Sequence, residues 1–220
     1  MIGVYVTVPA ACFRKGLARE YLETEIIPPP STCYGFLLSL VGETDRRKHI
    51  GVRVTPMLFG EPDTSVVLRT VWRVKKQPLG SPGNTRPDYQ QILTGLELII
   101  WLDSRDDCNQ DHSLEKRVQD ALHPQKRGTI HRFGGLSLGE STHLVDQVAL
   151  YQANVINDFH PSKIRLYKLN DQGRLGLPVW VDHVGSANTV HVIGDLVDLE
   201  QITEPAWNEM PQITSSRERS

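Results

Sequence analysis

The spacing of hydrophobic positions predicts alternating strands and helices along the first half of the chain. Residues 2–8 (IGVYVTV) are rich in β-branched and aromatic types, which predicts a strand. In residues 33–43 (CYGFLLSLVGE) the apolar side chains fall on one helical face, so we expect a helix that ends at Gly42. Residues 50–58 and 65–76 are the next two expected strands.

A long irregular segment is expected at residues 77–94, because three prolines and two glycines fall within its first eleven positions. The strongly apolar residues 95–103 predict a strand on its far side, which gives a hairpin with an extended tip. Residues 113–122 are amphipathic and predict a second helix. Several short strands are then expected between residues 145 and 196.

This order of elements predicts an α+β fold of the β-α-β-β-α-β type, which is the ferredoxin-like (RRM-like) order. We expect that domain over residues 1–150, with residues 50–58 as an extra strand. A C-terminal β-rich extension is expected over residues 151–205. The polar residues 206–220 are expected to form a frayed tail.

Composition narrows the class of protein. The chain has 220 residues, 39% hydrophobic and 23% charged residues and a mean hydropathy of −0.31, which is typical of a soluble globular protein. Cys12, Cys33 and Cys108 are widely spaced without a CxxC pair, so neither a disulfide framework nor a zinc site is expected. The N-terminus predicts a strand rather than a signal peptide, no segment is long enough to cross a membrane, and we expect a cytoplasmic location.

The net charge of −2 hides an uneven distribution. Residues 46–86 contain nine Lys and Arg but two acidic residues, which gives +7 there and −9 elsewhere. Within the strand at 65–76 one face carries the basic residues Arg69, Arg73 and Lys75 among valines, and the other face is apolar. Such a basic ladder is suited to following a phosphate backbone, although a solvated basic face without a partner fits the charges equally well.

Two further segments contain groups that bind anions. Ser31 and Thr32 follow three prolines and are good N-cap residues, and the free N–H groups of a helix start can hold a phosphate. The simpler interpretation is that these residues only connect an extended segment to a core helix and bind no ligand. In residues 126–146 (KRGTIHRFGGLSLGESTHLVD), glycines allow close backbone approach beside basic residues, but the sequence lacks the ending of a Walker A loop.

Four stretches together resemble the Cas-five family of CRISPR-associated proteins: ETEIIPPPSTCYGFLLSLVGE, SVVLRTVWRVKK, NTRPDYQQILTGLELIIWLD and RFGGLSLGESTHLVD. The most similar members belong to type I-B and myxobacterial-type systems, and the resemblance covers roughly residues 1–150. It implies a ferredoxin-like domain of the RAMP superfamily that caps the 5′ handle of CRISPR RNA in the Cascade surveillance complex. It also implies that residues 77–94 form a thumb hairpin against the guide and the adjacent backbone subunit.

The resemblance and the local chemistry imply a set of RNA-binding residues. They supply cations, main-chain amides, hydroxyls and the stacking surfaces of Tyr34, Tyr89 and Phe133. The full expected set is Arg14, Lys15, Ser31, Thr32, Tyr34, Arg69, Arg73, Lys75, Lys76, Arg86, Tyr89, Arg132, Phe133, Gly134, Gly135, Ser137 and Gly139.

We expect a non-catalytic subunit without metal or cofactor, because in I-B-like systems a separate subunit cuts the precursor RNA. Relatives of type I-C cleave it themselves, so a metal-independent endoribonuclease is the alternative, with acid and base candidates Tyr21, Tyr34, His49, His131 and His143. A ferredoxin-like module that binds a metabolite or has a structural role is a third hypothesis. The expected partners are the crRNA handle, the backbone and large subunits, target DNA indirectly, and transposition proteins where the system is transposon-associated; no membrane is expected.

Overall fold

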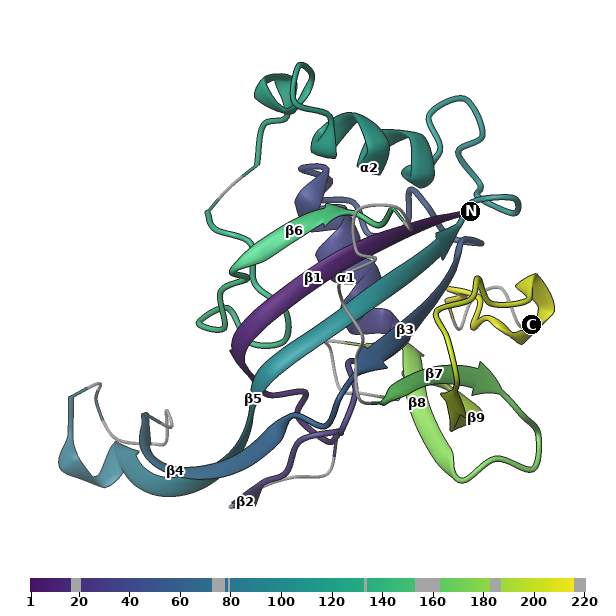
Figure 1. The fold of residues 1–220 in the computed structure, drawn as a ribbon. Coiled ribbons are helices and arrows are strands. Elements are labelled where there is room, and N and C mark those ends of the chain that lie inside the picture. Colours follow the sequence, from purple (N-terminus) through teal and green to yellow (C-terminus); the bar gives the residue numbers. More distant parts are fainter. Residues whose placement is uncertain are drawn as a thin grey trace.

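The described part of the chain folds into a nine-stranded sheet with two α-helices (Figure 1). The computed structural model describes residues 1–16, 21–72, 78, 80–132, 134–152, 163–182 and 187–215, with only the backbone of 71, 72, 82 and 86. The strands are β1 (Ile2–Ala11), β2 (Tyr21–Leu22), β3 (Arg53–Phe59), β4 (Asp63–Trp72), β5 (Thr85–Asp103), β6 (Gln147–Leu150), β7 (Ile164–Leu169), β8 (Leu175–Trp180) and β9 (Val190–Leu199). The helices are α1 (Pro30–Leu40) and α2 (Leu114–Leu122), and short 3-10 turns lie at Pro82–Asn84, Arg127–Thr129 and Trp207–Glu209.

The sheet is almost entirely antiparallel, with the order β6-β1-β5-β3-β7-β9-β8. The α+β class expected from the sequence is confirmed. Helix α1 connects β1 to β3, and α2 connects β5 to β6. The extra strand, however, was assigned to the wrong segment: β3 lies between β5 and β7, whereas β4 pairs only with β5 and lies off the main path of the sheet. Six of the seven residues of β3 are buried, as expected for a strand covered on both faces.

The β4–β5 hairpin is longer than its sequence suggests (Figure 1). Strand β5 has 19 residues, and its first half pairs with β4 from Thr85↔Trp72 to Thr94↔Asp63. Gly95, with φ +67°, marks the point where β5 passes from β4 to β3. The irregular segment predicted over 77–94 is therefore wrong for residues 85–94. The prediction failed because Pro87 was taken as a loop residue, whereas it lies on a hairpin edge, where a strand tolerates proline.

Apolar side chains cover both faces of the central strands. On the face toward the helices, Val6 and Leu98 are fully buried in one cluster with Leu37 of α1 and Val118 of α2. Both helices therefore pack on the same side of the sheet. On the opposite face, a second cluster is centred on the buried Trp101.

The C-terminal strands continue the same sheet, because β7 pairs with β3 at Leu166↔Met57. The frayed tail predicted over 206–220 is wrong for residues 206–215. Met210 and Ile213 are fully buried, and main-chain hydrogen bonds of 2.9 Å join Ile213 to Gly51 and Val52. A few apolar residues in a polar segment are enough to seat it on the part of β3 that β7 leaves unpaired. Residues 216–220 of the predicted tail lie outside the described residues.

No helix in the described ranges is both long and apolar enough to span a lipid bilayer.

Candidate nucleic-acid interface

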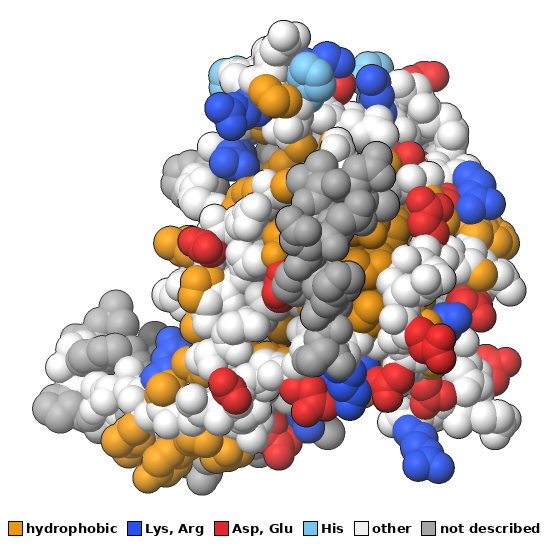
Figure 2. Space-filling model, viewed as in Figure 1, with side chains coloured by type: hydrophobic (Ala, Val, Ile, Leu, Met, Phe, Trp, Pro, Cys, Tyr) orange, Lys and Arg blue, Asp and Glu red, His pale blue; other side chains and the backbone are white. Residues whose placement is uncertain are grey.

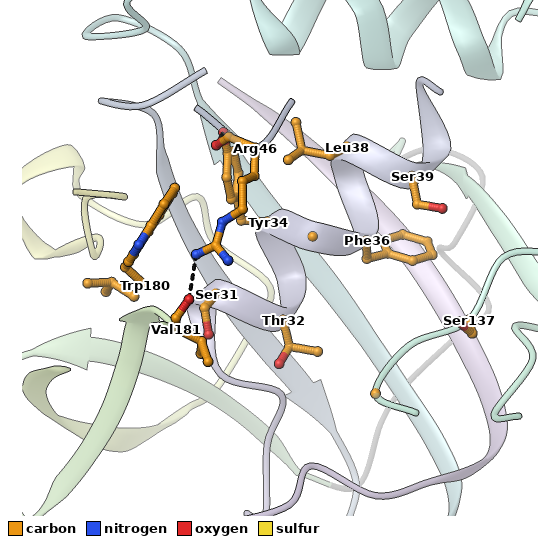
Figure 3. A pocket seen from close by; sticks show the side chains of 13 residues that line it. Ser31, Thr32, Tyr34, Phe36, Leu38, Ser39, Arg46, Ser137, Trp180 and Val181 are labelled. Carbon is orange, nitrogen blue, oxygen red and sulfur yellow. Dashed lines mark hydrogen bonds between the residues drawn. The ribbon is translucent and has the colours of Figure 1, made fainter. Parts of the chain in front are cut away.

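Helix α1 forms the floor of a groove with a volume of about 350 Å³ (Figure 3). One wall is the end of β8 and the residue after it, Trp180 and Val181. The other wall is the glycine-rich loop, residues 134–139, through Ser137 and Gly139. The groove is lined by Ser31, Thr32, Tyr34, Gly35, Phe36, Leu38, Ser39, Arg46, Ser137, Gly139, Val179, Trp180 and Val181.

The floor presents hydroxyl groups and bare backbone. Ser31, Gly35 and Ser39 are four residues apart, so they share one face of α1, and that face lines the groove. Gly35 is exposed, and an added Cβ there would meet nothing within 4 Å. The Ser31 hydroxyl oxygen is buried and has no hydrogen-bond partner among the described residues. A buried hydroxyl of this kind retains its capacity to bind a ligand.

The helix start differs from the sequence interpretation. Pro29 occupies the N-cap position without a side-chain hydrogen bond, and its carbonyl accepts from the amides of Thr32 and Cys33. The prediction that Ser31 and Thr32 cap the helix is therefore wrong. Consecutive prolines already fix the backbone, and Pro30 has no N–H to satisfy, so the helix begins at Pro30, two residues earlier than it would with Ser31 as the cap.

Arg46, which sequence analysis did not select, is held in a defined orientation at this groove. Its guanidinium carbon lies 3.7 Å from the centroid of the Trp180 ring, and its Nη2 donates to the Val181 carbonyl at 2.6 Å (Figure 3). The Tyr34 hydroxyl donates to the Arg46 carbonyl at 2.8 Å. Burial lowers the pKa of the guanidinium, which still leaves it charged at neutral pH. Among the described residues no carboxylate forms an ion pair with Arg46, although the charge of Asp182 acts on the guanidinium and favours its protonated form.

Tyr34 does not provide the exposed stacking surface that the sequence suggested. Its ring is 3% exposed, and burial raises the pKa of its hydroxyl group. The physical reason is that Tyr34 lies on the inward side of α1, where its ring joins the core and only its hydroxyl reaches the turn containing Arg46. Its contribution to the groove is therefore to position Arg46.

The glycine-rich loop is anchored tightly to the end of β1. Gly139 has a φ of +96°, and an added Cβ would lie 2.7 Å from the Cys12 carbonyl oxygen. The Cys12 amide donates to His143 Nδ1 at 3.2 Å, and Leu138 is fully buried. Gly134 and Gly135 are exposed in the same loop but do not line the groove. Only Ser137 and Gly139 of the predicted loop residues contribute to it.

The β4–β5 hairpin exposes its apolar face rather than its basic one. Val66 and Leu68 are 51% and 63% exposed, and Tyr89, opposite Leu68, is 54% exposed. Tyr21 of β2 pairs with Tyr89 and is also exposed. Figure 2 shows hydrophobic side chains gathered on the outer surface of this hairpin. We call Tyr21, Val66, Leu68 and Tyr89 the hairpin patch.

Arg69 lies on the other face of the hairpin and is already paired. Its Nη1 donates to Glu140 Oε2 at 2.8 Å and also to the Gln90 side-chain oxygen. Gln90 is fully buried and donates from Nε2 to Glu140 Oε1 at 3.0 Å. The basic ladder is therefore not a free cationic surface at Arg69, because this face turns toward the glycine-rich loop. The other ladder residues, Arg73, Lys75 and Lys76, lie outside the described residues.

Of the remaining predicted RNA-binding residues, Arg14, Lys15 and Arg132 do not line the groove. Arg14 and Lys15 follow β1, where Lys15 Nζ is 3.9 Å from Glu23. Arg132 lines a separate cavity of about 270 Å³ between the end of α1, α2 and β6. Arg86 is described only by its backbone in β5, and Phe133 lies outside the described residues.

The histidines considered for acid–base catalysis have mostly structural environments. His49 is fully buried, with Nδ1 2.9 Å from Asp107, and its Nε2 accepts from Arg117 at 2.9 Å. A guanidinium can only donate, so in this geometry Nε2 is the acceptor and Nδ1 the donor to Asp107. His143 is buried against Cys12, whereas His131 is exposed. In the described ranges, no three His, Cys, Asp or Glu side chains are grouped as they would be in a metal site.

Comparison with known proteins places this fold among CRISPR-associated proteins. No protein-family model matches the chain. A solved structure titled "CRISPR RNA-guided surveillance complex" matches with a TM-score of 0.57 at 12% identity over 94% of this chain and 95% of the other. One titled "Crystal structure of Cas protein" matches with a TM-score of 0.51 at 12% identity over 90% and 93%. At these identities the likeness concerns the fold.

The sequence comparison is more specific. The CRISPR-associated protein Cas5 of Myxococcus xanthus (strain DK1622) is 44% identical over 215 residues, which cover 97% of both chains. The chain therefore belongs to the Cas5 family, and the resemblance found in the sequence is confirmed.

Proposed function

We propose that this chain is a non-catalytic subunit of a type I CRISPR Cascade complex, and that it holds the 5′ handle of crRNA in the groove over α1. The observation that carries the proposal is the convergence of three elements on one groove: hydroxyls and bare backbone on α1, the loop at Gly139, and the oriented cation Arg46. Irregular single-stranded RNA is bound by such hydrogen-bonding groups and by stacking on guanidinium planes. The titles of the matched proteins agree with this role.

The strand order supports assignment of the first 150 residues to the ferredoxin-like fold of the RAMP superfamily. Strands β6, β1, β5 and β3 are adjacent in that order, and α1 and α2 make the two crossovers on one face. This is the pattern of the split βαβ unit. In this assignment the β4–β5 hairpin is the insertion, and it corresponds to the thumb.

The hairpin patch supports docking of a protein partner, and we assign that partner to the neighbouring backbone subunit. Val66, Leu68 and Tyr89 form an apolar surface with an aromatic residue, which is the composition of an interface core rather than of an RNA-binding surface. The large subunit, and target DNA through the guide, are further partners in this proposal. It places the chain in a type I-B-like system of the cytoplasm, with transposition proteins added where the system is transposon-associated.

Handle binding is tested by substituting Arg46. Arg46→Ala removes a charged hydrogen-bonding group, and we expect it to weaken binding of a repeat-derived handle RNA about tenfold. This corresponds to about 1.4 kcal/mol of binding free energy. Arg46→Lys retains the charge but not the planar stacking surface, so an intermediate affinity is expected. The matched control is Arg174→Ala, because Arg174 is exposed and does not line the groove. Fluorescence anisotropy measures all three variants.

An unchanged RNA affinity for Arg46→Ala would show that the groove is not the RNA-binding site.

The same preparations test the alternative of an endoribonuclease. Incubation of repeat RNA with the wild-type chain in EDTA is expected to leave the RNA intact. Cleavage that disappears in a single histidine variant such as His131→Ala would favour the endoribonuclease hypothesis over the non-catalytic binding subunit.

A further inference from the structure

A small polar cluster joins the middle of the β4–β5 hairpin to the rest of the protein. Arg69 of β4 and Gln90 of β5 both bond the carboxylate of Glu140, which follows the glycine-rich loop, at 2.8 and 3.0 Å. Arg69 also donates to Gln90, so the three side chains form a closed triangle. We call Arg69, Gln90 and Glu140 the clasp.

The loop side of the clasp is fixed to the body of the protein. The Glu140 carbonyl accepts from the His143 amide at 2.9 Å, and His143 in turn accepts from the Cys12 amide. Immediately before Glu140, Leu138 is fully buried and Gly139 packs against the Cys12 carbonyl. Glu140 therefore extends from a rigid turn whose preceding residues form one wall of the α1 groove.

From this geometry we infer that the clasp is a positioning device: it fixes the direction of the β4–β5 hairpin relative to the α1 groove. Arg69 and Glu140 are then positioning residues, and Arg69 is not a phosphate ligand. The role in assembly rests on the proposed function, since the groove would hold RNA and the hairpin patch a protein, and both must reach their partners at once. The mechanical part of the inference does not depend on any ligand.

The electrostatics of the site favour positioning over direct RNA contact. The side chains of Arg69 and Glu140 are 40% and 30% exposed, so a phosphate that approached Arg69 would also approach the carboxylate. Gln90 is fully buried and uses both ends of its amide inside the triangle.

Removal of either charge is the direct test. Spin labels are placed on Thr70→Cys, at an exposed hairpin position, and on the exposed native Cys108, and their distance distribution is measured. Arg69→Gln, Glu140→Gln and the double variant are each expected to broaden the distribution about twofold, and the double variant no more than either single one. Such non-additivity is the signature of a shared interaction. An unchanged distribution in either single variant overturns the inference.

Glu209→Gln is the matched control, because its ion pair with Lys168 has the same 2.8 Å distance and a similar exposure but joins β7 to the C-terminal turn. No broadening is expected there. Melting temperatures confirm that every variant is folded, and the neutral isosteres keep the size of the side chains.

RNA affinity supplies a second, independent readout. If Arg69 bound phosphate, Arg69→Gln would weaken handle RNA binding and Glu140→Gln, which removes a negative charge, would strengthen it. The clasp instead predicts that both variants weaken binding, by about threefold. Changes in opposite directions overturn the inference. If the wild-type chain binds no handle RNA, the proposed function fails, and the distance measurement alone still decides the clasp.

Discussion

Two arginines from the same basic zone have opposite environments in this protein. The guanidinium carbon of Arg46 lies 3.7 Å from the centroid of the Trp180 ring, the side chain donates to a carbonyl, and among the described residues no carboxylate forms an ion pair with it. Arg69 donates to Glu140, and its charge is already compensated. A cationic side chain is therefore an anion-binding group or a structural one according to its neighbours, and the sum of charges along a segment does not distinguish the two.

The α1 groove and the hairpin differ in the same way. The groove is made of hydroxyls, bare backbone and one oriented cation, which suits a polar, flexible ligand. The hairpin carries an exposed apolar patch on one face and a compensated polar cluster on the other. The two regions thus offer separate surfaces to two kinds of partner.

The largest effect is expected from a substitution that disturbs the close contact between the glycine-rich wall of the groove and the end of β1. Gly139→Ala combines a φ of +96° with a Cβ that would lie 2.7 Å from the Cys12 carbonyl oxygen. We expect the free energy of unfolding to fall by about 2–3 kcal/mol, with about a tenfold loss of handle RNA affinity. Gly134→Ala is the control, since Gly134 has a φ of +76° but an open space at the Cβ position. Its expected cost is about 1 kcal/mol.

Urea unfolding measures both variants. Equal destabilisation at the two positions would show that backbone conformation alone, and not the contact with β1, holds the loop.

Low pH is expected to weaken the interactions of arginines that are bound to a carboxylate, and Arg46 has no such ion pair among the described residues. Arg117 Nη1 donates to Glu43 at 2.6 Å, and Lys48 lies 2.8 Å from the same carboxylate. Burial alone would raise the pKa of Glu43, but these hydrogen bonds outweigh it and lower the pKa to about 2. Because the folded pKa lies below the unfolded value of 4.5, this stabilisation is complete above pH 4.5 and is lost as the pH falls toward 2.

Between pH 6 and pH 3 the contribution of Glu43 to the free energy of unfolding is expected to fall by on the order of 2 kcal/mol. Urea unfolding at the two pH values measures it, and the difference should shrink in Glu43→Gln. An identical pH dependence in the variant would contradict the assignment.

The smallest expected effect has opposite signs in stability and in binding. Gly35→Ala adds a methyl group to the exposed face of α1 without a steric contact, so helix propensity should raise stability by about 0.5–1 kcal/mol. The same methyl group occupies the groove floor, and we expect handle RNA affinity to fall about threefold. Gln119→Ala on α2 is a neutral helix substitution outside the groove. A variant of Gly35 with unchanged affinity would argue against RNA on the floor.

Much of the architecture follows from local sequence patterns. The strand β1, the helices α1 and α2 and the stop at Gly42, which follows the C-cap of α1, were all predicted, because each has a clear period or a stop residue. Strand pairing was harder. Segments 50–58 and 65–76 both look like strands, and only their non-local partners decide that β3 lies in the centre of the sheet and that β4 pairs with β5 alone.

The functional site was predicted in part. Of the predicted residues, Ser31, Thr32, Tyr34, Ser137 and Gly139 line one groove. Alternation along β4 correctly separated an apolar face from a basic one, but period alone does not say which face meets solvent. Arg46 and Trp180 were missed because they are 134 residues apart in the sequence, and no local pattern joins them.

The pairing of residues 211–213 with β3 has a consequence for biosynthesis. Gly51, Val52 and Val54 bond their main chains to a segment that leaves the ribosome after every strand of the sheet. Until then the start of β3 and the two residues before it form an open edge beside apolar residues, which is a template for aggregation. The growing polypeptide must therefore shield that edge for most of its translation. A truncation that ends before Pro211 is expected to leave it open permanently.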